Sequence, residues 1–160
     1  MQLELNAAGW QVINDGVMGG LSRGELVTRG SGLLFRGQIS LENNGGFSSV
    51  RCRFVQSFAD ITGFRLTLRG DRRAYQFRLR ADESVDGVAW RAEFPTNGQM
   101  QTIELVLADF EPVIRGRRIA RPGTLDPAHV HLLGFMLADR RAGPFELEVH
   151  GIETLERSVA

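Results

Sequence analysis

Few residues of this chain have the type and spacing that catalysis or metal binding requires. His129 and His131 are two residues apart, which places both on one face of a strand. A zinc site needs a third and usually a fourth ligand, and the surrounding sequence supplies no obvious cysteine or carboxylate. Cys52 lies in the alternating run Ser49–Phe54, which favours a buried thiol, and no serine occupies a Gly-x-Ser-x-Gly elbow. We therefore expect no catalytic residue, no bound metal and no cofactor.

Paired carboxylates are another arrangement that could support catalysis, because glycoside hydrolysis uses two of them. Glu146 and Glu148 point to the same side of a predicted strand, as Arg78 and Arg80 do on another. An ion-paired, hydrated sheet face explains both pairs more simply. The sequence thus favours a binding protein over an enzyme.

Two glycine-rich segments, residues 15–22 and 42–51, hold the polar residues that could form a pocket. Neither has the Gly-Lys-Ser/Thr ending of a phosphate loop. One interpretation is purely structural, since glycines permit tight turns and Asp or Asn side chains stabilise them. The other is that the segments lie together and form a polar pocket lined by Asp15, Ser22, Asn43, Asn44 and Arg51. In either case we expect the two segments to be neighbours, and Asp15, Asn43 and Asn44 to bond to loop backbone.

An arginine-rich sheet face is a second candidate site. Polar residues alternate with apolar ones on three predicted strands and should project from one side of adjacent strands: Arg65, Thr67, Arg69, Gln76, Arg78, Arg80, Arg91 and Glu93. If that side is the concave face of a sandwich, its arginines form a groove that can bind carboxylates or phosphates in a bidentate manner. An ordinary hydrated outer face is the alternative.

The longest stretch without clear periodicity is Asp109–Val130, and such stretches are unusual in a compact domain without a role. It contains Arg115, Arg117, Arg118 and Arg121. It is either a hydrated connection between sheets or a basic contact for an anion or acidic partner. We expect Phe110 to anchor it in the core and Arg115 or Arg117 to pair with a carboxylate, which leaves Arg118 and Arg121 free.

Period-two alternation extends along the whole chain and predicts the elements that position these residues. Glycine-rich turns separate the alternating runs, and no helical run exceeds two turns, although Asp126–His131 suits one short helical turn capped by Asp126. This pattern predicts one all-β domain over residues 1–160, a two-sheet antiparallel sandwich, barrel or jelly roll. The large apolar residues expected in its core are Trp10, Phe35, Phe64, Phe77, Trp90, Leu105, Phe135 and Phe145.

Composition narrows the class of partner and the compartment. The 19 basic residues, all arginine, balance 19 acidic ones, which argues against a nucleic-acid-binding protein. A single cysteine cannot form an intrachain disulfide and fits a reducing compartment. Residues 1–10 lack the features of a signal peptide, and no apolar run reaches the roughly 18–20 residues that span a bilayer. We expect a cytoplasmic protein without a membrane span.

The glycine-rich segments also carry a resemblance to a known family. Trp10 with Asn14-Asp15-Gly16-Val17-Met18-Gly19-Gly20, and then Glu42-Asn43-Asn44-Gly45-Gly46-Phe47, resemble the first two blocks of the complex I intermediate-associated protein 30 family. Gly70-Asp71 with Tyr75, Arg115-Gly116-Arg117, and Gly143-Pro144-Phe145 are similar to its later blocks. Arg72 and Met100 depart from the family pattern, which commonly has Gly and Trp there.

The resemblance implies a galactose-binding-like jelly roll and, from the mitochondrial members, a chaperone-like assembly factor for respiratory complex I. That likeness implies a protein partner, with a respiratory-complex component as the candidate. A carbohydrate- or small-anion-binding module is the alternative that the fold and the arginines leave open. Sugar sites usually offer an exposed aromatic side chain. The only Tyr and both Trp of this chain are expected on the buried sides of their strands, which makes an anion a better candidate than a sugar.

Overall fold

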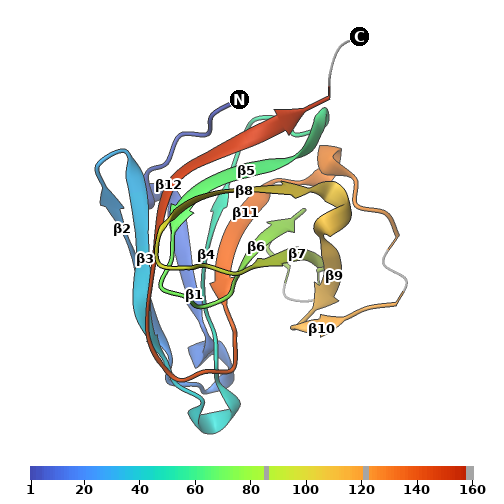
Figure 1. The fold of residues 1–160 in the computed structure, drawn as a ribbon. Helices are drawn as coiled ribbons and strands as arrows, with labels where there is room; N and C mark the ends of the chain where they lie inside the picture. Colours follow the sequence, from blue (N-terminus) through green and yellow to red (C-terminus); the bar gives the residue numbers. More distant parts are fainter. Residues whose placement is uncertain (85–86, 121–122, 158–160) are drawn as a thin grey trace.

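The computed structural model describes residues 1–84, 87–120 and 123–157, without the side chains of residues 17 and 18. Its strands form two antiparallel sheets that face each other across an apolar core (Figure 1). One sheet has seven strands in the order β1-β4-β11-β6-β7-β9-β10, and the other has five in the order β2-β3-β12-β5-β8. The predicted all-β jelly-roll sandwich is confirmed.

The seven-stranded sheet carries most of the residues that matter for function. Its strands are β1 (Trp10–Asn14), β4 (Ser48–Arg53), β11 (Leu132–Leu137), β6 (Tyr75–Arg80), β7 (Ala89–Phe94), β9 (Glu111–Ile114) and β10 (Arg117–Arg118). The last two lie within the stretch that the sequence predicted to be irregular, and that prediction was wrong. Short strands broken by Pro112 and by a turn at residues 115–116 give too little alternation to be recognised.

The five-stranded sheet has the last strand of the chain at its centre. Its members are β2 (Arg23–Arg29), β3 (Gly32–Ile39), β12 (Gly143–Glu156), β5 (Ile61–Arg69) and β8 (Met100–Val106). β12 pairs with β3 on one side and with β5 on the other. The N-terminal residues run beside the second half of β12, where Leu3 N donates to Ile152 O (2.8 Å) and Thr154 N to Met1 O (2.8 Å) (Figure 1).

Short 3-10 helices make up the helical content of the described residues. They are Ala7–Gly9, Asp15–Met18, Glu42–Asn44, Leu107–Asp109 and Pro127–His129. The last confirms the helical turn expected near residue 126, because the Asp126 side chain accepts from Ala128 N at 3.0 Å. None of the helices in the described part of the chain is long and apolar enough to cross a membrane.

The core between the sheets is rich in aromatic rings. Phe77 on β6 contacts Phe64 edge-to-face and Phe135 in a tilted arrangement, both at centroid distances of 5.2 Å, within the range of favourable aromatic pairs. Six of the eight residues predicted to be in the core are buried; Trp10 and Trp90 are only partly buried and pack against its margin. The alternation of apolar and polar residues therefore identified correctly which of these side chains point inward. How deeply each is buried depends on the position of its strand in the sheet.

Candidate functional site

The two glycine-rich segments are neighbours, as predicted, and Asp15 joins them. This carboxylate is completely buried. Its Oδ1 accepts from Ser22 N at 2.9 Å, and its Oδ2 accepts from Gly46 N at 2.6 Å and Phe47 N at 3.3 Å. One side chain thus holds both loops, and we call this arrangement the Asp15 junction.

The glycines of both segments make room for this carboxylate. A Cβ added at Gly20 or Gly45 would overlap the Asp15 carboxyl group, whereas a Cβ at Gly16 would meet nothing within 4 Å. Burial alone would raise the pKa of Asp15, but the hydrogen bonds from Ser22, Gly46 and Phe47 outweigh it and lower the pKa below its ordinary 3.8. Asp15 is therefore ionised at neutral pH and held by backbone N–H groups.

The other polar residues of the two segments also bond within the loops. Asn43 has a positive φ of 57° and donates from Nδ2 to Gly19 O at 3.2 Å. Ser22 Oγ donates to Ser40 O at 3.1 Å and accepts from Ser40 N at 2.9 Å. Asn44 contributes a left-handed backbone, but its side chain makes no hydrogen bond to the described residues, so that part of the prediction was wrong. Asp15 and Ser22 are buried, so neither side chain can line an open polar pocket.

The predicted arginine face does not exist as a single surface. Arg65, Thr67 and Arg69 are on β5 of the five-stranded sheet, whereas Gln76, Arg78, Arg80, Arg91 and Glu93 are on β6 and β7 of the other sheet. The polar sides of these strands therefore face away from each other across the core. The alternation of polar and apolar residues shows which side of a strand is polar, but it does not show that β5 and β6, although consecutive in the chain, belong to different sheets.

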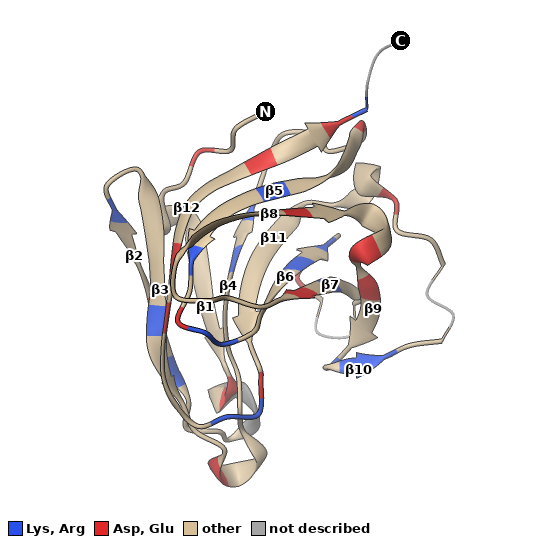
Figure 2. Ribbon diagram, viewed as in Figure 1, with Lys and Arg blue, Asp and Glu red and all other residues tan. Residues whose placement is uncertain are grey.

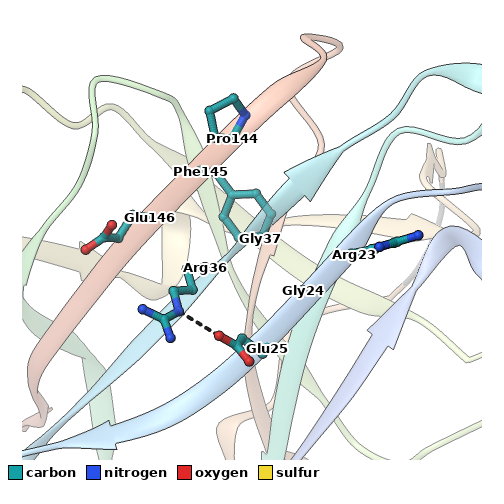
Figure 3. Close-up of a pocket in the computed structure, with 8 residues that line it drawn as sticks. All are labelled: Arg23, Gly24, Glu25, Arg36, Gly37, Pro144, Phe145 and Glu146. Atoms are coloured by element: carbon teal, nitrogen blue, oxygen red, sulfur yellow. Dashed lines mark hydrogen bonds and ion pairs between the residues drawn. The ribbon is translucent and has the colours of Figure 1, made fainter.

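On the five-stranded sheet, Arg29, Arg36 and Arg65 are engaged by carboxylates, whereas Arg69 donates to Gly98 O at 3.2 Å. Arg65 forms ion pairs with Glu104 at 2.6 Å and Glu153 at 3.2 Å, both on neighbouring strands. A shallow hollow of about 440 Å³ lies over β2, β3 and β12 (Figure 3). Its most prominent polar contact is the ion pair between Arg36 Nε and Glu25 Oε1 at 2.6 Å. This face corresponds to the ordinary ion-paired sheet surface.

The seven-stranded sheet is different, because arginines on β4, β6 and β7 alternate with the buried residues Val50, Phe77 and Ala92 and therefore share its outward face. Arg51 on β4 and Arg78 on β6 are both in register with Gly134 on β11, which lies between them. Arg78 is in turn opposite Arg91 on β7. Together with Arg80, two residues along β6, these residues form what we call the arginine cluster: Arg51, Arg78, Arg80 and Arg91.

Within the part of the chain that the structure describes, one member of the arginine cluster has a close carboxylate partner. Arg91 Nε lies 2.9 Å from Glu111 Oε1 on β9. Arg78 Nη1 donates to the neutral acceptors Gln76 Oε1 at 2.9 Å and Met136 Sδ at 3.2 Å. Arg80 donates to backbone carbonyls of residues 82 and 84.

Electrostatic repulsion follows from this gathering of like charges. Burial, with the charges of Arg80 and Arg91, lowers the pKa of Arg78 to about 10. Burial and the charge of Arg51 lower the pKa of Arg80 as well. Both guanidinium groups remain charged at neutral pH, so the cluster attracts anions.

The β9–β10 hairpin borders the arginine cluster and contains further basic residues (Figure 2). Phe110 is buried at its start, as predicted. Arg118 was expected to be free, but its Nε lies 3.4 Å from Glu111 Oε2. Arg117 is exposed, and Arg115 lies at the turn with a positive φ of 50°. The predicted role of Arg121 lies outside the described residues.

The remaining candidates for chemistry are dispersed. His129 is in a 3-10 helix and His131 precedes β11, so they do not share a strand face, contrary to the prediction. Burial raises the pKa of the Cys52 thiol, which favours its unreactive form. Within the described ranges, no group of three or more His, Cys, Asp or Glu side chains could hold a metal ion.

A second polar junction, which no local pattern in the sequence predicted, is formed by Asp71 and the buried Arg73. Asp71 accepts from Tyr75 OH at 2.9 Å and from Glu146 N at 2.7 Å. Arg73 binds Asp139 through two hydrogen bonds, at 2.6 and 2.8 Å, and also donates to the carbonyls of Arg141, before β12, and of Gly143 and Pro144 at its start. Gly70-Asp71 was recognised only as a family block, and nothing local in the sequence indicated that Arg73 would be buried.

The comparisons with known proteins agree with this architecture. Residues 2–149 match the family described as Complex I intermediate-associated protein 30. No curated protein matches the chain.

Solved carbohydrate-binding modules share the fold. The family 11 carbohydrate-binding module of a cellulosomal cellulase from Clostridium thermocellum has a TM-score of 0.72 at 13% identity, covering 100% of this chain and 97% of that one. The module solved with a β-1,3-1,4-mixed-linked tetrasaccharide has a TM-score of 0.71 at 15% identity, covering 99% and 98%. An exo-β-agarase has a TM-score of 0.60 at 9% identity, covering 99% of this chain but 25% of that one. At these identities the likeness shows a common fold.

Proposed function

Because this chain belongs to the complex I intermediate-associated protein 30 family, we propose that it is a non-catalytic binding module that engages a protein partner, as an assembly factor does. The observation that carries the proposal is the arginine cluster on the outward face of the seven-stranded sheet. Arg51, Arg78 and Arg80 lack close carboxylate partners there among the described residues. A family of this name makes a respiratory-complex component the first partner to test.

The family motifs support a binding role because their residues serve the fold. The Asp15 junction buries one carboxylate of the blocks that carry the resemblance, and Asp71 accepts from Tyr75 OH and Glu146 N. These groups hold loops in place and leave the sheet faces as the surfaces open to a partner. A partner with acidic side chains would be attracted to the arginine cluster and oriented by it.

Affinity purification from the native host tests this function. We expect the tagged wild-type protein to recover a partner at near-stoichiometric level in mild salt, and R78Q to recover much less. R65Q is the matched control, because it removes the same charge from the opposite sheet, where Arg65 already pairs with Glu104 and Glu153. Failure of the wild-type protein to recover any near-stoichiometric partner would contradict the proposal.

A carbohydrate or small-anion ligand is the second candidate function. The observation that favours it is the likeness to carbohydrate-binding modules, one of which was solved with a tetrasaccharide. Against a neutral sugar, Tyr75 is completely buried, and Trp10 and Trp90 face the core margin, so they offer no open platform for a sugar ring. A thermal-shift screen of glycans and organic acids separates the candidates: a glycan that raises the melting temperature at about millimolar concentration would favour this one.

A further inference from the structure

The backbone of Gly134 lies in the middle of the arginine cluster and is buried. Gly134 on β11 is in register with Arg51 on one side and Arg78 on the other. Strands in a sheet are about 4.8 Å apart, so two strand spacings, about 10 Å, separate the backbones of the two arginines. Glycine has no side chain to fill the space between them. A Cβ at Gly134 would also lie 2.6 Å from Val50 O, so the close packing of β4 and β11 requires glycine here.

Within the described residues, the arginine donors on either side of Gly134 are incompletely used. Arg51 Nε is buried and has no hydrogen-bond partner there, and such unsatisfied buried donors are rare in folded proteins. Arg78 donates to the amide oxygen of Gln76 and the sulfur of Met136. Two ion pairs border this position: Arg91–Glu111 lies on the far side of Arg78, towards β9, and Arg53–Glu83, at 3.8 Å, lies two residues along β4 from Arg51.

We infer that the space between the Arg51 and Arg78 side chains, over Gly134, is a subsite for a carboxylate side chain of an acidic, extended segment of the partner. This inference rests on the proposed function. A carboxylate offers about four lone-pair sites and can accept from two guanidinium groups at once. The negative charge of this carboxylate would offset the repulsion among the positive charges of the arginine cluster.

The geometry favours an acidic peptide over an acidic sugar. Arg78 and Arg80 project from the same side of β6, two residues apart, and side chains on one face of any extended strand repeat at about 7 Å. A peptide with acidic residues at alternate positions therefore matches this spacing. The described residues of this face provide no aromatic ring on which a sugar could stack, since Phe77, Leu79 and Trp90 occupy the inward phase of β6 and β7.

Binding of a defined peptide to the folded protein tests the inference. The probe is a fluorescent Glu-Gly-Glu-Gly-Glu peptide, compared with the same peptide carrying Gln in place of Glu. We expect saturable, salt-sensitive binding of the Glu peptide below about 1 mM, and about tenfold weaker binding to R78Q or R51Q. R65Q should bind like the wild type. Unchanged thermal melting of each variant shows that the loss does not come from unfolding.

Each outcome decides a different part of the argument. Equal affinity for the Glu and Gln peptides, or an equal loss of affinity in R65Q and R78Q, would contradict the proposed subsite. An oligogalacturonate, citrate or inorganic phosphate that binds more tightly than the peptide, with the same dependence on Arg78, would overturn the acidic-peptide assignment. A native partner recovered equally well by R78Q would overturn the inference while leaving the proposed function intact. Peptide binding without any native partner would contradict the proposed function and leave the subsite supported.

Discussion

Replacement of Asp15 by asparagine tests whether one buried carboxylate holds the glycine-rich loops together. Its two oxygens accept three backbone N–H groups in a site with no exposure to solvent. An asparagine amide has one oxygen, so its NH2 group must face at least one of those donors. A buried donor without an acceptor costs about 1–3 kcal/mol, and bonds to a charged acceptor are the stronger ones that would be lost. We expect D15N to reduce the free energy of unfolding by about 2–4 kcal/mol.

Urea denaturation at neutral pH measures this change. The midpoint should fall without a change in the slope m, and the melting temperature should drop by about 5–15 °C. D109N is the matched control, because Asp109 also accepts a backbone N–H, from Val106 at 2.8 Å, but is exposed and can be replaced by an amide oxygen. If D15N is no less stable than D109N, the carboxylate does not hold the loops and the reasoning fails.

The effect of pH gives a second check on the same variant. The pKa of Asp15 is lowered in the folded protein, so its stabilisation is complete above the ordinary value of 3.8 and is lost as pH falls through the folded value. The stability difference between wild type and D15N should therefore be constant from neutral pH to about pH 5. It should shrink on acidification below about pH 4. A difference that grows at acid pH would contradict the assigned role.

The other predictions concern packing and the second junction, and urea denaturation measures each. G20A should lose about 3 kcal/mol or more because its Cβ overlaps the Asp15 carboxylate, whereas G16A should change stability by less than about 1 kcal/mol; equal effects would refute the steric argument. R73M should lose about 3–5 kcal/mol because it leaves a buried carboxylate uncompensated, and a neutral result would show that the pair can be dispensed with. F77A should lose about 3–5 kcal/mol through a cavity among aromatic rings, and a loss below about 1 kcal/mol would mean that the core collapses around it.

Local patterns in the sequence predicted local geometry well. Alternation identified the inward residues Phe64 and Phe77, because the two sides of a strand meet different environments wherever the strand lies. The short polar side chains beside glycines predicted that Asp15 and Asn43 would bond to loop backbone.

Long-range arrangement was harder to predict, and it determines the candidate site. Arg65 and Arg78 have the same local pattern, but β5 and β6 belong to different sheets. Arg51 was assigned to a loop pocket, yet its register with Gly134 places it beside Arg78. An isolated glycine in an apolar strand is a signal of close backbone approach, and Gly134 could have been noticed on that ground. Which residues flank such a glycine depends on which strands pair with its own strand. Local patterns in the sequence do not reveal that pairing.

The central place of β12 has a consequence for how the chain acquires its fold during synthesis. β2 with β3, and β5 with β8, are separate pairs until β12 enters between them. Residues 143–156 are made last among the strands, so the facing edges of β3 and β5 stay without hydrogen-bonded neighbours until then. Non-local pairing of this kind is slow, and open strand edges invite association with other chains. The nascent protein thus passes through a period in which half of its sandwich is incomplete, and its yield should depend on how quickly the ribosome delivers that final strand.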